Sequence, residues 1–425
     1  MSERRPAVAF VMVTLLIDVI GIGLIIPILP ILVGEFTASR EAQANWYGWI
    51  AAAYGATQFL CAPLLGALSD RFGRRPLLLV GIAGLGATFL VAALAQSLGL
   101  ILLARVLGGG LSANFAVAQA YVADVTTPEK RTQSLGMLGA MFGIGFVLGP
   151  MLGGLLGHVA LRLPLYAAAG MCVLNWLYGL LVLPESLSGE RRRPFALARA
   201  NPLAALSGVG RLQGVGGLVV ALAFNMFPQL MLQFTWVLYT TFKFGWGPRE
   251  TGFSLFVVGV VAVIVQGGLL GRLISALGER RLILAGLLSG ALAYAGYGLA
   301  TQGWMMYVLI CCNFLAFASA VALQGIVSKA AGADAQGRTM GALASLNSLL
   351  GIPAPIISNT ILGEVSHLAA SDWRVGAPFF LCSALQALAF VVAWRHFAAR
   401  RGAAVGSDEA PPLPLGRGGW GERGR

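Results

Sequence analysis

Uncharged apolar stretches of eighteen or more residues recur along the whole chain and constrain its fold more than any other feature. A helix needs about 20 such residues to cross the roughly 30 Å hydrocarbon core of a bilayer. With 11% charged residues, the chain falls well below the roughly 25% of a soluble domain. The sequence predicts an all-α membrane protein whose twelve transmembrane helices lie at residues 7–34, 45–68, 76–96, 98–123, 132–158, 163–183, 214–242, 250–275, 282–300, 303–328, 339–363 and 375–398.

Arginines and lysines divide unequally between the two sets of loops. With the N-terminus in the cytoplasm, 23 of the 29 lie inside, 5 lie outside, and Arg105 falls within a span. This bias predicts a plasma-membrane protein with both termini cytoplasmic. The first span carries Asp18 and ends in Pro27 and Pro30, so we expect a retained helix and not a cleaved signal peptide. The net charge of +12 follows from topology, and no nucleic-acid partner is expected.

The hydrophobic pattern is interrupted once, by a polar connector between two groups of six helices. It predicts an N-terminal half at 1–183, a cytoplasmic connector at 184–213, a C-terminal half at 214–398 and a disordered cytoplasmic tail at 399–425. The string GALSDRFGRR from Gly66 has a degenerate echo, GRLISALGERR, from Gly271, 205 residues later. Arg131 and Arg338 open matching segments 207 residues apart. Two landmarks with nearly one spacing indicate duplicated halves, an architecture that places a transport site near the midplane between them.

Six motifs occur in a fixed order along the chain: IDVIGIGLIIPILP, CAPLLGALSDRFGRRP, ARVLGGG, YVADVT, GFVLGPMLGG and LPES…GERR…NPL. With this set the chain resembles the major facilitator superfamily, and within it the drug/proton antiporters of the tetracycline efflux type. The resemblance implies secondary active transport of a small molecule by rocking of the two halves. It also implies a monomer that works in the bilayer with the proton gradient as its energy source and no cofactor.

The turn after the second helix combines glycines, an acid and arginines. A glycine at 66 permits close helix contact, and Asp70 can lie against a helix N-terminus. The resemblance adds a conformational latch of Gly66, Asp70, Gly73, Arg74 and Asp124, in which Arg74 pairs with Asp124 and holds the outward-facing state. The alternative is a basic loop that only follows the topology rule.

The fifth helix carries Gly145, Gly149 and Gly153 at four-residue spacing, with Pro150 beside them. Small residues on one face let two helix backbones approach closely, and the proline removes a backbone donor and bends the helix. The segment also resembles the motif of exporters, which favours antiport over import.

Asp18 and Arg105 are the only charged side chains well inside the predicted spans. A charge at that depth costs at least about 2.5 kcal/mol and normally faces a cavity or a partner. Burial disfavours the ionised carboxylate and a nearby guanidinium favours it, so Asp18 is the candidate proton-coupling residue. The alternatives are a permanently ionised structural pair, or an Asp18 that accepts from backbone donors near Gly21.

We expect the fourth helix to form one wall of the substrate cavity. Small and polar residues recur along it at three- and four-residue intervals and form a stripe that we expect to face the interior. Polar and aromatic residues of the seventh and eighth helices are further candidates. The predicted cavity residues are Arg105, Ser112, Phe115, Gln119, Trp236 and Gln266.

The chain departs from the tetracycline pattern at membrane acids. The resemblance implies aspartates at positions held here by Thr88 and Gly290, and a histidine at Ala262, whereas Gln266 matches. Because hard divalent cations favour carboxylate oxygens, we expect poor export of magnesium-chelated tetracycline and better export of neutral or weakly basic hydrophobic compounds.

Two other functions would have to explain the same spans. A facilitator or proton symporter that imports a metabolite would share the fold, and the direction of proton flux distinguishes it. A membrane-embedded enzyme is not expected, because the sequence has no HExxH or GxSxG motif, no metal-ligand spacing and no paired carboxylates in the spans.

Overall fold

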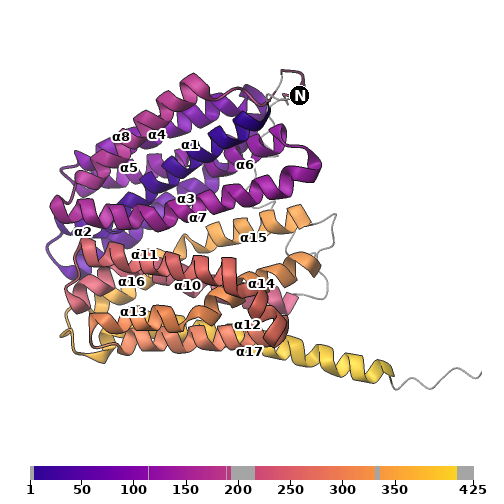
Figure 1. Ribbon diagram of the computed structural model, residues 1–425. Coiled ribbons are helices and arrows are strands. Elements are labelled where there is room, and N and C mark those ends of the chain that lie inside the picture. Colours follow the sequence, from indigo (N-terminus) through magenta and orange to yellow (C-terminus); the bar gives the residue numbers. More distant parts are fainter. Residues whose placement is uncertain (1–3, 113, 188, 193–215, 331–335, 409–425) are drawn as a thin grey trace, which may run out of the picture.

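The computed structural model describes residues 4–112, 114–187, 189–192, 216–330 and 336–408 (Figure 1). Over these residues the secondary structure is helical, without a strand. The helices of the N-terminal half are α1 (Arg4–Ile25), α2 (Leu29–Gly34), α3 (Arg40–Phe72), α4 (Arg74–Ala93), α5 (Leu98–Leu111), α6 (Asn114–Val125), α7 (Pro128–Val159) and α8 (Leu163–Val182). The short 3-10 helix η1 (Gly189–Arg191) follows.

The C-terminal half begins with α10 and ends with the long helix α17. Its elements are α10 (Gly216–Phe244), α11 (Pro248–Ile264), η4 (Val265–Leu269), α12 (Leu270–Leu299), α13 (Gly303–Cys312), α14 (Phe314–Ala330), α15 (Gln336–Leu350), α16 (Pro353–Val365), η6 (Trp373–Gly376) and α17 (Ala377–Asp408).

The described helices account for the twelve predicted crossings. Ten segments are long and apolar enough to span a membrane, and the pair α13 and α14, bent by 45°, forms an eleventh. One of the ten is the 52-residue segment Pro248–Leu299, which Gly278 divides because its φ of 75° lies outside helical geometry. Counting this segment as two crossings gives the predicted twelve.

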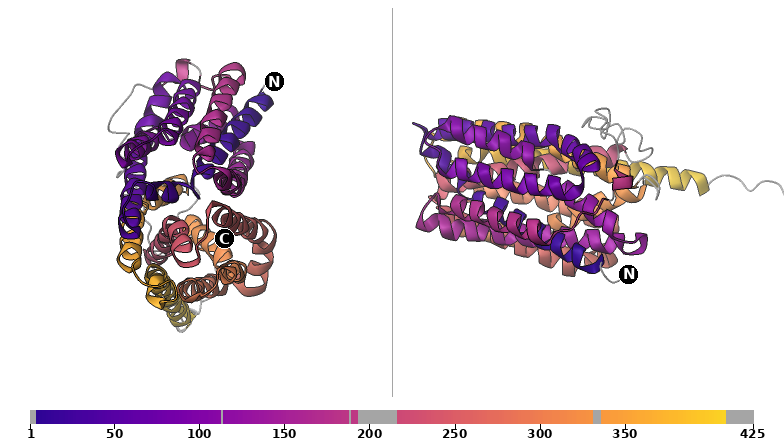
Figure 2. Two further views of the ribbon diagram at one scale, coloured as in Figure 1. Left: turned by 90° about the vertical axis from the view of Figure 1, so that its left-hand side faces the viewer. Right: turned by 90° about the horizontal axis from the view of Figure 1, so that it is seen from above.

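Seen from one end, the two halves form separate groups of helices, indigo to magenta and salmon to yellow (Figure 2). Their internal repeat is visible in the backbone. Gly73 and Gly278 both adopt positive φ, 108° and 75°, at turns that connect equivalent helices 205 residues apart, the offset seen between Gly66 and Gly271. Glycine tolerates this conformation because it has no Cβ.

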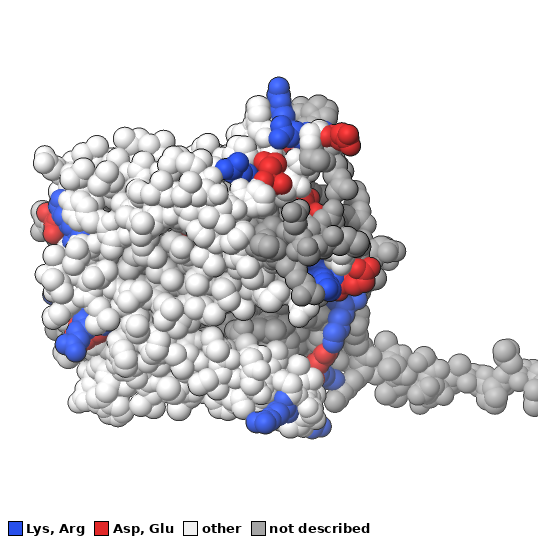
Figure 3. Space-filling view, turned by 45° about the horizontal axis from the view of Figure 1, so that its top comes forward, with Lys and Arg blue, Asp and Glu red and all other residues white. Residues whose placement is uncertain are grey.

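Charged side chains gather toward the two ends of the molecule and leave an uncharged band between them (Figure 3). We name the end with the turns at Gly73 and Gly278 the basic face, and the end with the turns at Ser39 and Gly247 the opposite face. The basic face carries the arginines and lysines of the α3–α4, α6–α7 and α12 turns. The band between the faces matches a bilayer-embedded surface.

The two halves meet near the opposite face. A Cβ added at Gly154 of α7 would lie 2.9 Å from the Cα of Gly252 of α11, and one at Gly48 of α3 would lie 2.8 Å from the carbonyl oxygen of Pro355 of α16. Only glycine permits such backbone contacts. The opposite face is therefore closed.

Toward the basic face the halves separate. Added Cβ atoms would have no neighbour within 4 Å at Gly66 of α3, at Gly136, Gly139 and Gly143 of α7, or at Gly267, Gly268 and Gly271 around η4. The structure thus represents a conformation that is open toward the basic face.

The connector and the tail differ in how much of each the structure describes. Most of the connector, 193–213, lies outside the described residues, and α10 begins at Gly216. The tail was predicted to be disordered from residue 399, but its first part is helical, because α17 continues to Asp408. Residues 409–425 lie outside the described chain.

Candidate functional site

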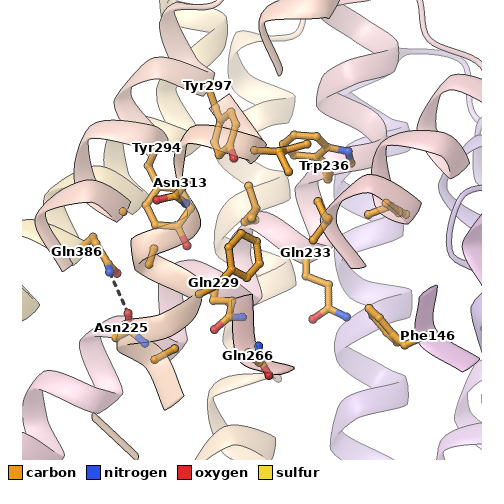
Figure 4. A pocket seen from close by; sticks show the side chains of 18 of the residues that line it. Phe146, Asn225, Gln229, Gln233, Trp236, Gln266, Tyr294, Tyr297, Asn313 and Gln386 are labelled. Atoms are coloured by element: carbon orange, nitrogen blue, oxygen red, sulfur yellow. Dashed lines mark hydrogen bonds between the residues drawn. The ribbon is translucent and has the colours of Figure 1, made fainter. Parts of the chain in front are cut away.

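A cavity of about 220 Å³ is lined mostly by residues of the C-terminal half (Figure 4). Its polar wall consists of carboxamides, and none of the described lining residues carries a charge. The N-terminal half contributes Ile26 and Phe146. The carboxamides are Asn225, Gln229, Gln233, Gln266, Asn313 and Gln386, and the aromatic lining residues of the C-terminal half are Trp236, Tyr294 and Tyr297.

Local helix geometry positions these side chains. Asn225, Gln229 and Gln233 follow one another at intervals of four on α10, so they share one face. Gln266 lies in the π-helix η4, a form that appears mostly as single turns at functional sites. The widened turn presents Gln266 to the cavity while α11 and α12 continue as one segment.

An aromatic cluster separates the cavity from the opposite face. The indole nitrogen of Trp236 donates to Ser254 Oγ at 2.9 Å, and its ring lies edge-on to Tyr297 at 5.3 Å. Tyr239 packs on Phe379 at 4.4 Å and donates to the carbonyl oxygen of Tyr297 at 2.6 Å. These rings pack against one another on the side of the cavity that faces the opposite face.

Gly290, the position at which the resemblance implied an aspartate, lies at one corner of the cavity. Gly290 lines the cavity, and an added Cβ would lie 2.9 Å from Nε2 of Gln386. That amide donates to Oδ1 of Asn225 at 2.9 Å, and Gln386 is only 2% exposed. A neutral amide pair thus stands beside the site of the missing acid.

Asp18 lies apart from this cavity, buried in α1 with 4% exposure. Asn114, at the start of α6, donates from Nδ2 to Oδ2 of Asp18 at 3.0 Å. The side-chain oxygen Oδ1 of Asn114 lies against Gly81 of α4, and a Cβ at Gly81 would collide with this oxygen. Asp18 Oδ1 has no partner among the described residues.

Neither structural alternative for Asp18 is found in this conformation. Among the described ion pairs none includes Asp18 or Arg105, and the described hydrogen bond of Asp18 comes from Asn114, not from a backbone donor near Gly21. The guanidinium of Arg105 instead lies over the rings of Tyr54 and Phe89, at 5.5 and 5.9 Å. Arg105 is 8% exposed, and its Nε and Nη2 have no described partner.

The predicted cavity wall on the fourth helix does not line this cavity in the present conformation. Ser112 Oγ donates to the carbonyl oxygen of Gly109, Phe115 packs on Phe142 at 5.2 Å, and Gln119 is exposed. None of these residues, nor Arg105, lines the cavity. Along α5 the reason is the cover by α3, because a Cβ at Gly109 would collide with Tyr54 and Thr57; Phe115 and Gln119 belong to α6. Trp236 and Gln266 do line it.

The predicted latch residues come together at the basic face. Arg74 pairs with Asp70 at 2.6 Å and with Asp124 at 3.1 Å, and Nη1 donates to Ser69 Oγ at 2.5 Å. The resemblance implied a pair that holds the outward-facing state. Here it is formed while the opposite face is closed, because both partners belong to the N-terminal half and move together. The close contact expected at Gly66 is also absent in this conformation.

Glu185 completes this turn and was not singled out from the sequence beyond its place in LPES. Its Oε1 accepts from the backbone N–H groups of Arg74, Ser186 and Leu187 at 2.9, 3.0 and 3.1 Å. A carboxylate at the N-terminus of α4 satisfies donors that the helix itself leaves free. A Cβ at Gly73 would collide with this carboxylate, which explains the glycine there.

The glycines of the exporter motif join α7 to α1. A Cβ at Gly149 would lie 2.7 Å from the Cα of Gly23, and one at Gly145 would lie 2.8 Å from Cβ of Val19. Gly153 approaches Leu24 in the same way, and α7 runs unbroken through Pro150. The seam therefore holds the helix that carries Asp18.

The sequence profile of the Major Facilitator Superfamily matches residues 11–355. The chain belongs to the Major Facilitator Superfamily. A tetracycline resistance protein, class C, of Escherichia coli is 36% identical over 89% of this chain and 96% of its own length. Superfamily membership at this coverage establishes that the chain is a multi-pass membrane transporter of small molecules and not an enzyme. It also confirms the resemblance drawn from the motifs.

Solved structures of superfamily members share the fold. The human organic anion transporter MFSD10 (TETRAN) is 27% identical, with a TM-score of 0.65 over 92% of this chain and all of that chain. A bacterial homologue of the human lysosomal transporter Spinster, in an inward-facing and occupied conformation, has a TM-score of 0.73 at 15% identity, over 94% of this chain and 97% of that chain.

Proposed function

We propose that this transporter exports neutral or weakly basic amphipathic compounds from the cytoplasm in exchange for protons. The observation that carries the proposal is the separation of two sites. An uncharged cavity of carboxamides and aromatic rings lies in the C-terminal half, and a buried acid outside that lining lies in the N-terminal half. The name of the class C relative, a tetracycline resistance protein, supports drug export.

The cavity chemistry defines the substrate class. Rings such as Trp236 and Tyr297 offer faces for a planar apolar body, and the six carboxamides offer both donors and acceptors without a net charge. A cation that enters this site loses its hydration water, and no carboxylate is present to take the place of that water. Burial of the cation would therefore be costly. Neutral or weakly basic compounds therefore fit better than a magnesium chelate.

Asp18 is the proposed proton carrier. An ionised oxygen buried without a donor is unfavourable, and Asp18 Oδ1 has none among the described residues. This supports a protonated carboxyl in the present conformation, with Asn114 bound to its other oxygen. Movement of α1 with α7 through the glycine seam would change the surroundings of Asp18 and release the proton.

We assign the basic face to the cytoplasm. The excess of arginine and lysine there follows the positive-inside rule, so both termini are cytoplasmic and the present conformation faces inward. The protein acts as a monomer in the plasma membrane, because the cavity is built within one chain. The proton gradient drives transport, and no cofactor is needed.

The test is proton and drug flux in inside-out vesicles from cells that lack their own pumps. Export predicts alkalinisation of the vesicle lumen when drug enters it, since protons leave in exchange. A metabolite symporter would move protons and substrate in the same direction. A susceptibility panel in the same host should show protection against neutral lipophilic drugs and little against tetracycline with magnesium; the opposite pattern would refute the substrate class.

A further inference from the structure

A second cavity, of about 340 Å³, lies near the opposite face and is separate from the transport cavity. Both halves line it. Met151 and Leu155 belong to α7, Arg249, Glu250 and Phe253 to α11, and Tyr307 to α13.

The cavity lies at the level of a membrane–water interface. Its residues occupy the last turns of α7 and the first turns of α11 and α13. Trp304, one turn before Tyr307 on α13, is 58% exposed, and Trp49 and Trp373 near the same face are 59% and 63% exposed. Exposed tryptophans at one level mark the headgroup region of a bilayer.

One side of the cavity is apolar and open. Phe253 is 53% exposed and Leu155 is 49% exposed. The ring of Phe253 lies 5.9 Å from that of Tyr307 and 6.2 Å from that of Phe256. Such a surface suits hydrocarbon better than water.

The other side is polar and carries one charge of each sign. Arg249 is exposed, and none of the described ion pairs includes it. Glu250 Oε2 accepts from the backbone N–H of Gly247 at 3.0 Å, which fixes this side chain at the N-terminus of α11. A cation and an anion thus stand next to each other above an apolar wall.

We propose that this cavity binds a zwitterionic phospholipid of the external leaflet whose headgroup carries a phosphate and a primary ammonium. Arg249 binds the phosphate, since guanidinium groups match phosphate oxygens in charge and geometry. Glu250 accepts from the ammonium, and an acyl chain lies along Leu155 and Phe253. The adjacent opposite charges explain the preference for such a headgroup over an anionic one, which Glu250 repels.

The bound lipid has a consequence for transport. Because α7 belongs to one half and α11 to the other, the cavity exists only while these helices are packed together. Opening of the opposite face separates them and dismantles the site. The lipid therefore favours the present conformation by its differential affinity for it.

Native mass spectrometry of the purified full-length transporter tests the site. The chain is equilibrated with phosphatidylethanolamine, phosphatidylcholine or phosphatidylglycerol, and retained lipid is counted. We expect phosphatidylethanolamine to be retained best, and Arg249→Gln to weaken its retention about fivefold, the effect of one charge near a membrane surface. Arg374→Gln, which changes another arginine of the same face that is paired with Asp372, is the matched control and should retain lipid normally.

Glu250→Gln tests the headgroup class, because glutamine can still cap α11 but carries no charge. It should lower the retention of phosphatidylethanolamine to that of phosphatidylcholine and leave the latter unchanged. Equal retention of all lipids by the wild type, or normal retention by Arg249→Gln, would overturn the proposal. Unfolding temperatures of both variants in detergent, expected to match the wild type, exclude a folding defect as the cause.

The effect on conformation is measured by hydrogen exchange in nanodiscs. Phosphatidylethanolamine should slow exchange at the adjoining ends of α7 and α11 relative to phosphatidylcholine, and Arg249→Gln should remove the difference. An equal exchange rate in the two lipids for the wild type would contradict a role in the conformational equilibrium.

Discussion

Glu279 and Lys329 form an ion pair of 2.6 Å at the basic face of the C-terminal half, at the positions that the 205-residue repeat assigns to Arg74 and Asp124. The two pairs therefore occupy equivalent sites with their charges exchanged. They differ in burial: the side chain of Arg74 is 10% exposed, whereas that of Lys329 is 70% exposed. Position 275, which corresponds to Asp70, is a serine, so the second pair lacks the additional acid.

The exposed pair should tolerate exchange of its charges. Glu279→Lys alone places two cations together and should reduce transport, and the double variant with Lys329→Glu should restore it, because Coulomb attraction does not depend on which partner is positive. A surface pair contributes at most about 1 kcal/mol, so folding should not change. Exchange of Arg74 and Asp124 should not restore transport, since Arg74 also binds Ser69 and Asp70. Drug efflux from intact cells measures all variants, and equal rescue in both halves would contradict the distinction.

Asp70→Asn and Gly66→Val should each abolish transport while the protein stays folded in the membrane. The carboxylate of Asp70 is 41% exposed, so loss of its pair with Arg74 should cost at most about 1 kcal/mol. A Cβ at Gly66 would meet no atom within 4 Å, so both variants should keep the present fold. The loss must then arise in a state in which the basic face closes. Efflux is measured at matched membrane expression with Asp372→Asn of the opposite face as control. Wild-type efflux by both variants would refute the latch.

Asp18→Asn should uncouple export from the proton gradient. An amide of the same shape preserves packing against Asn114 but cannot release a proton. Drug binding, measured by fluorescence titration of the purified protein, should stay within about twofold of the wild type, a change below about 0.5 kcal/mol, because Asp18 does not line the cavity. Uphill drug accumulation in inside-out vesicles should vanish. If the Asp18→Asn variant still transports drug uphill with the pH dependence of the wild type, another residue must carry the proton.

Gly290→Asp should introduce export of cationic drugs, including tetracycline with magnesium. The new Cβ would approach only the end of the flexible Gln386 side chain, whose amide can donate to the carboxylate. An improvement of about 1.4 kcal/mol would raise the tolerated drug concentration about tenfold. Gly290→Asn has the same size without charge and is the control. An equal gain from both variants would show that charge is not the cause.

Glycines in the two halves of α7 should respond differently to substitution by leucine. Gly149→Leu forces a side chain into the backbone of α1, where Gly23 lies 2.7 Å from the new Cβ, and should lower stability by about 1–3 kcal/mol. Gly139→Leu points into open space and should leave the unfolding temperature unchanged but stop transport, by preventing closure of the basic face. Unfolding in detergent and efflux in cells separate the two effects. Normal efflux by Gly139→Leu would show that this face of α7 stays open throughout the cycle.

Some features of this protein follow from the sequence alone. Span length, loop charge and the 205-residue repeat depend on local composition, and they predicted twelve crossings and two related halves. The contact of Arg74 with Asp70 also follows from the sequence, because both residues flank one turn, whereas its contact with Asp124 of α6 came from the resemblance. Among the predicted cavity residues, Trp236 and Gln266 line the cavity, as expected because polar or amphipathic side chains inside a span normally face protein.

Only the tertiary structure decided where the cavity lies and what surrounds the two buried charges. Helical periodicity gives the polar stripe of the fourth helix, but it does not reveal that α3 covers α5 at Gly109 or that Phe115 packs on Phe142. It therefore could not show that Ser112, Phe115 and Gln119 do not line the cavity. The sequence left open a structural pair of Asp18 with Arg105, since both lie well inside the spans. Rotation of α1 and α5 about their axes instead turns Asp18 to Asn114 and Arg105 to Tyr54. Gln386, Tyr294 and Phe146 were missed for the same reason. A side chain's neighbours depend on helix rotation and packing between segments far apart in the chain, which the order of residues along one helix does not specify.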